Sequence, residues 1–365
     1  MTTYIGTSDF RHDQDDCTGI LLVNLGTTEA PTRDAVRRYL AEFLWDPRVI
    51  EIARPLWWLI LHGVILRLRP SKVARAYQSI WTDKGSPLLA ISERLSVALQ
   101  QRLSQQVSHR IEVALAMRYG QPSIEAVLQT LRERGMRRLL VVPMYPQYSA
   151  TTTATVFDEV TRVLQGWRWV PELRFIQHYH DHPGYIAALA ASVRAHWREK
   201  TPPEKLLMSF HGIPRRYFLA GDPYFCECQK TARLLAEELG LTADQWQLTF
   251  QSRVGREEWL KPYTDKTLAA WGKQKLRSVD VICPGFSVDC LETLEEIEQQ
   301  NRELFQARGG GAYSYIPALN DSPGQLDLLA ELVGMHLQGW EGQAGGSVES
   351  RQETQRRAQA LGAEH

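Results

Sequence analysis

Apolar runs and helical periods alternate along most of the chain, and this alternation constrains the fold more than any other feature. Short continuous apolar runs predict buried strands at 19–26, 111–119, 138–143, 174–179, 206–210, 246–251 and 279–283. Apolar residues at helical spacing predict intervening helices at 33–43, 123–134, 149–164, 184–199, 224–239, 266–273 and 326–337. Such alternation is typical of parallel sheets covered by helices on both faces, so we predict an α/β fold.

The pattern breaks once, at Thr201-Pro-Pro-Glu-Lys205, where prolines and charges precede a second series of strands and helices. The segments 21–26 and 206–212 open the two halves in a similar way, which predicts two related lobes with a cleft between them. The terminal segments are polar, and the tail from about Glu341 lacks an apolar period, which is typical of disorder or of a loose helix. The predicted division is a disordered N-terminus at 1–18, a first lobe at 19–200, a second lobe at 201–340 and a flexible tail at 341–365.

Charge balance and cysteine usage exclude several classes of protein. The chain has 42 basic and 42 acidic side chains and a formal net charge of zero, so nothing predicts nucleic acid as a partner. Its five cysteines lack the spacing of a disulfide framework and favour a reducing compartment. The aspartate-rich N-terminus does not resemble a signal peptide. We therefore expect a cytoplasmic protein.

One apolar segment, 55–66, bears on where the protein works. It is far shorter than the roughly 20 residues that a membrane-spanning helix needs, and Arg54, Arg67 and Arg69 flank it. A buried core helix is one interpretation. We favour an apolar lip at 54–69 that meets a membrane surface or a large flat apolar ligand, with arginines for lipid headgroups or carboxylates. Under that interpretation, the protein attaches peripherally to the inner face of the membrane.

The clearest chemistry lies in 281–298, where a buried strand breaks at Pro284-Gly285 and a helix is predicted to begin near Asp289. Glu292 and Glu296 are four residues apart, which places both carboxylates on one face of that helix. Two aligned acids can accept protons or hold a divalent cation. The alternative is structural, because Asp289 and Glu292 also have the spacing of a capping pair.

A histidine in the same half of the chain decides between these alternatives. His211 follows the predicted strand 206–210, and loops at the carboxyl ends of parallel strands carry the functional residues of open α/β lobes. Imidazole takes a proton near neutral pH and also suits ferrous iron. We therefore predict that His211, Glu292 and Glu296 share one site.

Other familiar chemistries find less support. No G-x-G-x-x-G follows the first strand and no G-x-x-x-x-G-K-[ST] occurs, which removes the usual signals for dinucleotide and P-loop phosphate binding. His178, His180 and His182 alternate and would share one face of an extended segment, but we favour surface or structural roles over a metal site. Cys226 and Cys228 form a close thiol pair without a second pair at zinc-type spacing.

Several motifs, in order along the chain, resemble the ferrochelatase family, whose members insert ferrous iron into a porphyrin. The resemblance runs from about Gly19 to Trp340 and is closest to proteobacterial members. The most specific motifs are Leu22-Val-Asn-Leu-Gly26, Tyr77-Gln-Ser-Ile-Trp81 with Gly85-Ser-Pro87, Tyr145-Pro-Gln-Tyr-Ser149, Ser209-Phe-His-Gly-Ile-Pro214, Phe250-Gln-Ser-Arg253, and Cys283-Pro-Gly-Phe286 followed by Cys290-Leu-Glu-Thr-Leu294.

The resemblance implies two Rossmann-like lobes around a porphyrin cleft, in agreement with the predicted fold. It places the invariant histidine of the family at His211 and its paired acids at Glu292 and Glu296, with His211 and Glu292 as the expected Fe²⁺ ligands. The porphyrin contacts that it implies are Leu25, Arg69, Tyr77, Ser86, Arg118, Tyr119 and Tyr148.

The implied reaction is that of a redox-neutral lyase, in which protoporphyrin IX and Fe²⁺ give protohaem and two protons in the last step of haem biosynthesis. His211 would accept a pyrrole proton, while Glu292 and Glu296 pass protons outward or guide iron inward. Fe²⁺ is a substrate, and no resident cofactor is expected. Many relatives bind a [2Fe-2S] cluster through a cysteine-rich C-terminal extension; this tail has no cysteine, so no cluster is expected.

Two alternatives stay open. A chelatase for coproporphyrin III or another tetrapyrrole would have the same fold, but the apolar lip favours protoporphyrin, because a more carboxylated substrate would need extra basic contacts. A non-catalytic haem- or porphyrin-binding protein would be expected to lack His211 or the two acids, and all three are present. We expect a monomer or a homodimer whose partners are porphyrin and ferrous iron.

Overall fold

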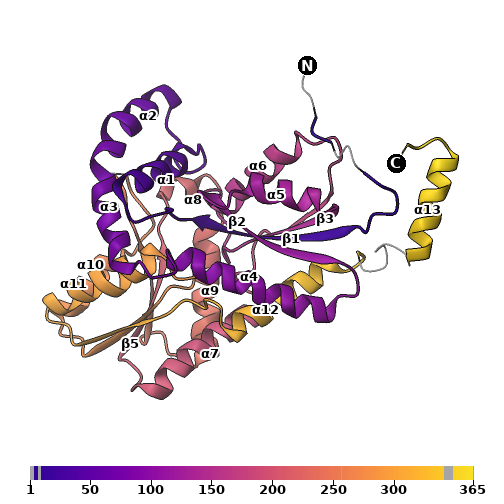
Figure 1. Ribbon diagram of the computed structural model, residues 1–365. Coiled ribbons are helices and arrows are strands. Elements are labelled where there is room, and N and C mark those ends of the chain that lie inside the picture. The colour runs from indigo at the N-terminus through magenta and orange to yellow at the C-terminus, as the bar shows by residue number, and fades with distance from the viewer. Residues whose placement is uncertain (1–3, 7–9, 256, 341–347, 365) are drawn as a thin grey trace.

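Two parallel sheets form the framework of the protein, and the computed structural model describes residues 4–6, 10–255, 257–340 and 348–364 (Figure 1). The first sheet has the strand order β2-β1-β3-β4 and the second β6-β5-β7-β8. All ladders between these strands are parallel, so the predicted α/β fold with two Rossmann-like sheets is confirmed. The strands are β1 (Cys17–Gly26), β2 (Ile111–Tyr119), β3 (Met136–Pro143), β4 (Glu172–Phe175), β5 (Lys205–His211), β6 (Trp246–Gln251), β7 (Ser278–Ile282) and β8 (Ala312–Ile316).

Helices cover both sheets and fill the space between them (Figure 1). Two segments, η1 (Leu61–Ile65) and η2 (Glu292–Asn301), are π-helical, with the wider i→i+5 hydrogen-bond pattern. The α-helices are α1 (Arg33–Trp45), α2 (Arg54–Ile60), α3 (Leu66–Ile80), α4 (Pro87–Gln106), α5 (Ile124–Glu133), α6 (Thr153–Leu164), α7 (Pro183–Glu199), α8 (Arg215–Leu219), α9 (Tyr224–Leu239), α10 (Thr264–Lys273), α11 (Arg302–Ala307), α12 (Pro323–Leu337) and α13 (Val348–Ala360).

One hydrophobic core joins the two sheets. It contains Ile20 and Leu22 of β1 together with Met208 of β5, and side chains of α4, α7, α9 and α12 complete it. Leu21 and Val23 point to the other face of the first sheet and pack there under α5 and α6. Both faces of β1 are therefore covered, which is why its sequence is a continuous apolar run. The apolar side chains of this one core pack against a face of each sheet and thereby hold the two sheets together.

The ends of the chain differ from the prediction of a disordered N-terminus and a flexible tail. β1 begins at Cys17, inside the predicted segment 1–18, and Ile5 exchanges backbone hydrogen bonds with the turn at 166–168. Residues 1–3 and 7–9 lie outside the described part. Within the predicted tail, 348–360 forms α13, and Arg351 contacts Asp15 at 3.2 Å. Residues 341–347 and 365 of the tail lie outside the described residues.

Two predicted boundaries also shift. β4 ends at Phe175 rather than at 179, because the chain then turns and the Tyr179 N–H donates to the Pro146 carbonyl at 2.9 Å. α6 begins at Thr153 rather than at 149, since the Ser149 hydroxyl instead donates to Asp222 at 2.9 Å.

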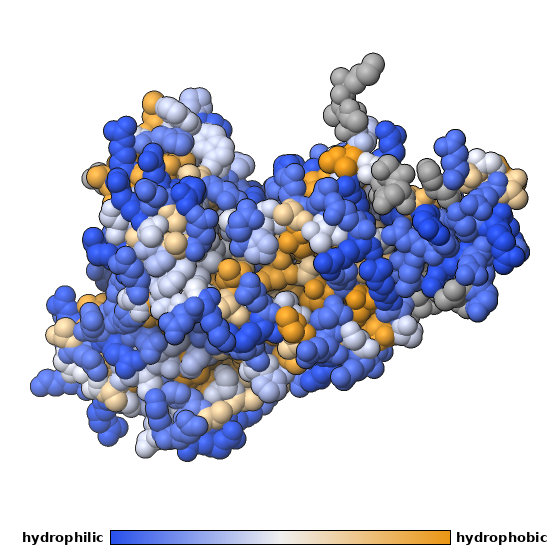
Figure 2. Space-filling view, viewed as in Figure 1, coloured by the Kyte–Doolittle hydropathy of each residue, from blue (hydrophilic) through white to orange (hydrophobic). Residues whose placement is uncertain are grey.

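The lip segment has one buried and one exposed apolar face, so both interpretations of it describe part of the structure. Trp57, Leu61 and Leu66 are buried in the core under α1 and α3. The exposed apolar side chains are Leu56, Trp58, Leu59, Val64 and Leu68. Figure 2 shows hydrophobic residues on the surface at the end of the molecule that α2 occupies. Among the described residues, no helix combines the length and the apolar character needed to cross a membrane.

Candidate active site

His211 is the last residue of β5, at the carboxyl end of a central strand of the second sheet. Its Nδ1 lies 2.7 Å from the carbonyl oxygen of Gly212. A carbonyl only accepts, so Nδ1 carries the proton in the neutral ring and Nε2 keeps its lone pair. Gly212 is required here, because a Cβ at that position would lie 2.9 Å from the carbonyl oxygen of Gln251. The half-buried imidazole is thus fixed in the tautomer that accepts a proton or a metal at Nε2.

Glu296 lies on η2 and is held by the residue that follows β6. The backbone N–H of Ser252 donates to Glu296 Oε1 at 2.9 Å, and the Ser252 hydroxyl donates to Oε2. Burial raises the pKa of the Glu296 carboxyl; the Ser252 hydroxyl and the charge of His211 oppose that shift, and the charge of Glu292 adds to it. Glu296 therefore interacts electrostatically with both His211 and Glu292.

The helix that carries the acids is π-helical rather than the predicted α-helix. Side chains donate hydrogen bonds to three backbone carbonyls of this wide turn. Gln251 donates to the Glu292 carbonyl at 2.9 Å, Asn301 to the Glu296 carbonyl at 2.8 Å and Tyr313 to the Ile297 carbonyl at 2.7 Å. The two acids lie close enough in this turn for the charge of Glu292 to raise the pKa of Glu296.

The capping interpretation of Glu292 is wrong. The Asp289 N–H donates to Asn320 at 2.8 Å, so it does not receive the Glu292 carboxylate. Asp289 itself is buried and accepts from Thr293 at 3.0 Å and from Tyr315 at 2.5 Å. Asp289 thus fixes the loop after β7 through its own partners, and the Glu292 carboxylate does not cap the helix.

Three of the predicted porphyrin contacts lie in one apolar cluster beside the acids. Leu25, Tyr77 and Tyr119 pack together, and Leu291 and Leu294 on either side of Glu292 pack against the same cluster. Burial raises the pKa of the Tyr77 hydroxyl, and the charge of Glu292 adds to the shift. Tyr77 and Tyr119 are almost completely buried in this structure. They form the wall behind the site, on the side of the first lobe.

Ser86 belongs to the same wall through a chain of hydroxyls. The Thr27 hydroxyl donates to Ser86 Oγ at 2.8 Å and also interacts with the Tyr77 hydroxyl. Thr27 follows Gly26, whose φ of 114° and close approach to the Tyr119 carbonyl exclude any other residue there. The ends of β1 and β2 therefore lie in close contact at Gly26 and Tyr119. Thr27, the next residue, contacts both Ser86 and Tyr77 at this end of the first sheet.

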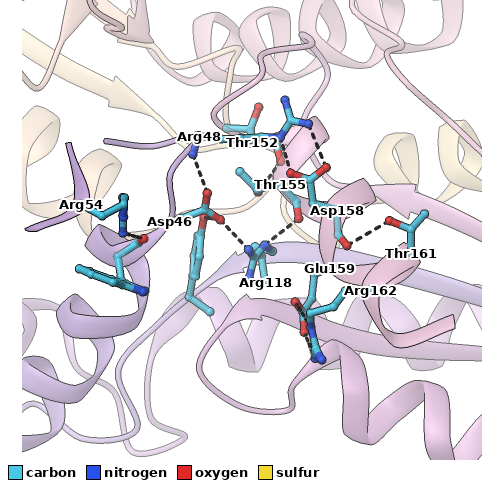
Figure 3. Close-up of polar contacts among 12 residues, drawn as sticks. Asp46, Arg48, Arg54, Arg118, Thr152, Thr155, Asp158, Glu159, Thr161 and Arg162 are labelled. Carbon is cyan, nitrogen blue, oxygen red and sulfur yellow. Dashed lines mark hydrogen bonds and ion pairs between the residues drawn. The ribbon is translucent and has the colours of Figure 1, made fainter. Parts of the chain in front are cut away.

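Arg118 is engaged by a buried carboxylate, as Figure 3 shows. Its guanidinium contacts Asp46 at 2.5 Å and donates to the Thr155 carbonyl at 2.8 Å. Tyr119 donates to the same carboxylate at 3.0 Å, and the backbone N–H of Arg48 does so at 2.8 Å. Arg118 and the Tyr119 hydroxyl are thus held by Asp46 at the end of α1, which fixes the Tyr119 ring in the wall that it forms with Tyr77.

The remaining two predicted contacts lie apart from this group. Arg69 is exposed on α3. Tyr148 is half-buried in the loop after β3, and its backbone N–H donates to Glu227 of α9 at 2.6 Å. Burial raises the pKa of the Tyr148 hydroxyl, while the charge of Arg48 lowers it. Arg54, predicted to serve ligand carboxylates or headgroups, instead lies over the Trp45 ring at 4.0 Å.

Sequence reasoning missed three residues that position the site. Gln251 is the last residue of β6 and Ser252 follows it, and both lie in the 250–253 motif. The argument from strand ends that singled out His211 therefore applies to them as well. Asp46 follows α1 with no motif around it, and nothing in the sequence marks it as the partner of Arg118. All five cysteines are free thiols in this structure.

A protein-family model described as Ferrochelatase matches residues 17–337. The chain belongs to the ferrochelatase family. The Ferrochelatase of Nitrosococcus oceani is 58% identical over 363 residues, which cover 98% of each chain. The Ferrochelatase of Thioalkalivibrio sulfidiphilus is 57% identical over 360 residues, again 98% of each chain. As a member of this family, the chain is a metal-chelating lyase.

Solved structures share the fold at low sequence identity. SirB from Bacillus subtilis with Fe³⁺ has a TM-score of 0.53 and 11% identity, over 90% of this chain and 98% of that chain. DR2241 from Deinococcus radiodurans, described as a multi-domain protein with structural similarity to chelatases, has a TM-score of 0.51 and 13% identity, over 87% of this chain and 54% of that chain. Family membership therefore rests on sequence, and these structures support the fold alone.

Proposed function

We propose that this protein inserts Fe²⁺ into protoporphyrin IX, giving protohaem and two protons in the last step of haem biosynthesis. The observation that carries the proposal is the grouping of His211, Glu292 and Glu296, of which the first has a free Nε2 and the last a raised carboxyl pKa. Metal insertion must remove two pyrrole protons, and these groups supply acceptors within one site.

His211 is the first proton acceptor or metal-binding group in this proposal. Its Nε2 keeps its lone pair because Nδ1 is committed to Gly212. Glu296 then takes a proton, since a buried carboxyl with a raised pKa exchanges protons closer to neutral pH than an exposed one does. Glu292 lies between Glu296 and the tyrosine wall, where its charge favours entry of Fe²⁺. No resident cofactor, and no [2Fe-2S] cluster, is needed for these steps.

Leu25, Tyr77 and Ser86, supported by Arg118 and Tyr119, are proposed to form the porphyrin-binding wall. A macrocycle with large apolar faces suits an aromatic and aliphatic wall. Arg69 and Tyr148 are proposed to contact the edge of the porphyrin, because both are accessible and carry polar groups.

We propose a cytoplasmic protein, monomeric or homodimeric, that attaches peripherally to the inner face of the membrane through the lip. The support is the exposed apolar face of α2, η1 and the start of α3. Arg67 and Arg69 are exposed beside that face and suit anionic headgroups, whereas Arg54 is occupied by Trp45. A surface of this kind would also receive an apolar substrate such as protoporphyrin from the bilayer.

The test is an anaerobic metallation assay with Fe²⁺ or Zn²⁺, comparing protoporphyrin IX with coproporphyrin III. Loss of free-porphyrin fluorescence together with the absorbance of the metalloporphyrin, faster with protoporphyrin, is the expected result. Faster turnover of coproporphyrin would refute the assigned substrate and leave the chelatase assignment intact. Quenching without metalloporphyrin absorbance would show a non-catalytic porphyrin-binding protein.

Two variants test the residues. His211→Ala is expected to abolish metallation while porphyrin binding, measured by fluorescence, persists. Glu292→Gln should reduce turnover severely. Glu295→Gln is the matched control, because Glu295 lies on the same helix but accepts from Gln300 at 2.6 Å. Wild-type turnover in the first two variants would remove those side chains from the mechanism.

A further inference from the structure

Outside the active site, two histidines and a glutamate converge at the edge of the first lobe. His178 and His180 lie in the loop between β4 and α7, and Glu227 lies on α9. One ligand atom from each residue lies within 4.8 Å of the other two. We propose that His178, His180 and Glu227 form a second binding site for a divalent first-row transition-metal ion, distinct from the site at His211.

The alternating sequence places two of the three histidines on the same side. Tyr179, between them, points the other way, and its hydroxyl lies 3.0 Å from Ser287. His182 does not join the pair, because it accepts from the Gly184 N–H at 3.2 Å and caps α7. The predicted common face therefore holds for His178 and His180 only.

An unsatisfied buried imidazole indicates that a ligand is missing. The His180 side chain is 8% exposed. Its Nδ1 lies 3.3 Å from Glu227 Oε2, yet it forms no hydrogen bond within the described residues. Buried polar atoms without a partner are rare, and each needs a compensating group.

Glu227 supplies an anionic ligand between the two rings. Its side chain is 8% exposed, and Oε1 lies 2.7 Å from His178 Nδ1. A nearby lysine does not cancel this charge, because Lys230 is paired with Asp181. Buried carboxylates are normally paired or bound to metal. An ion here would be held by the charge of Glu227 and by both imidazoles.

The donor set selects the class of metal. Two imidazoles and one carboxylate suit Zn²⁺, Fe²⁺ or Co²⁺ and do not suit Mg²⁺ or Ca²⁺, which prefer oxygen ligands. Metal–ligand bonds of about 2.0–2.2 Å place tetrahedral ligands roughly 3.4 Å apart. His178 Nδ1 and Glu227 Oε1, now 2.7 Å apart, must therefore separate by about 0.7 Å, while atoms as far apart as 4.8 Å must close by about 1.4 Å. His178 can supply most of that movement, since its side chain is 49% exposed.

A bound ion would also fasten a loop of the active-site wall. Glu227 Oε2 accepts from the backbone N–H of Tyr148 at 2.6 Å, and Gln147 donates to Thr231 of α9 at 3.0 Å. Thr231 in turn donates to the His180 carbonyl at 2.7 Å. The loop after β3, the loop after β4 and helix α9 therefore meet at this point, and one ion would link them.

The experiment measures Co²⁺ binding by its visible absorption, with Zn²⁺ competition, in the His211→Ala background so that the active-site histidine does not contribute. One Co²⁺ per chain is expected in that background. Adding His178→Ala should weaken binding at least about tenfold, since even indirect partners of a metal site contribute that much. His178 is half exposed, so its replacement leaves the fold intact, which an unchanged circular dichroism spectrum would confirm.

The matched control is His182→Asn in the same background. Asparagine preserves the helix cap, so this change should leave Co²⁺ affinity unaltered. Glu227→Gln gives a second test, because the amide oxygen can still accept from Tyr148 while the anionic ligand is lost. Unaltered Co²⁺ affinity in both His178→Ala and Glu227→Gln, or equal loss in His182→Asn, would overturn the proposal.

Discussion

Replacing Ser252 with glycine should shift the pH dependence of turnover to higher pH. The Ser252 hydroxyl donates to the Glu296 carboxylate and thereby favours its ionised form. A hydrogen bond to a charged group is worth about 1.5–3 kcal/mol, and about 1.36 kcal/mol corresponds to one pKa unit. Loss of the hydroxyl should therefore raise the pKa of Glu296 further. The backbone N–H of residue 252 still donates to Oε1, so the carboxyl stays in place.

The assay is kcat/KM for Zn²⁺ insertion into protoporphyrin, measured from pH 5 to pH 9. If Glu296 accepts a proton during turnover, activity rises with pH as its carboxyl ionises, and this rise should move to higher pH in Ser252→Gly. Well above the shifted pKa the variant should regain most of the wild-type activity. An unmoved profile, or a loss of the same size at every pH, would refute the role assigned to Glu296.

A second substitution separates the hydroxyl from the backbone. Ser252 has a φ of 63°, in the left-handed region that glycine adopts freely and alanine does not. Ser252→Ala should shift the pH profile as glycine does. Serine and alanine both carry a Cβ, so Ser252→Ala should keep the wild-type backbone strain and be about 1 kcal/mol less stable than Ser252→Gly, visible as a lower Tm. A pH shift in the glycine variant alone would attribute the effect to the relaxed backbone rather than to the lost hydroxyl.

Three further outcomes follow from the structure. Glu296→Gln should raise Tm at pH 8 and leave it unaltered at pH 4. The raised pKa means that stability is fully present below the usual glutamate pKa of about 4.3 and is lost as pH rises through the folded-state value. Asp46→Asn breaks a buried ion pair and should cost about 3–5 kcal/mol in urea unfolding, whereas Asp158→Asn, on an exposed pair, should cost at most about 1 kcal/mol. Leu59→Ser should weaken sedimentation with anionic vesicles at least about tenfold, and the equally exposed Val97→Ser on α4 should not.

The strands and most helices could be predicted because both faces of each sheet are covered, which makes the strands continuous apolar runs. The link between His211 and the acids could be predicted for a topological reason. β5 and β7 are parallel neighbours, so the chain leaves both at the same edge of the sheet. Family resemblance was needed only to name the substrate and the porphyrin-binding residues.

The remaining features depend on contacts between segments that are distant in sequence. Asp46 holds Arg118 across two layers of the first lobe, and neither residue lies in a pattern that pairs them. Glu227 meets His178 and His180 because α9 packs beside the loop after β4, which no local spacing encodes. The π-helical turn η2 likewise accepts hydrogen bonds from side chains outside it, such as that of Gln251 to the Glu292 carbonyl.

The irregular backbone of the second lobe is concentrated around the two acids. Among the described residues, three non-glycine residues have a positive φ, and two of them support this region. Ser252 donates to Glu296, and Asn320 donates to Asp289 at 2.7 Å. The π-helical turn lies between these two supports. Each departure is unfavourable by itself, and a regular α-helix with an exposed glutamate would avoid them all. Ser252 and the π-helical turn both bear directly on the buried Glu296 carboxyl, and Asn320 fixes the loop that precedes this turn through Asp289. We therefore infer that the position of Glu296, rather than the stability of the lobe, determines the local conformation.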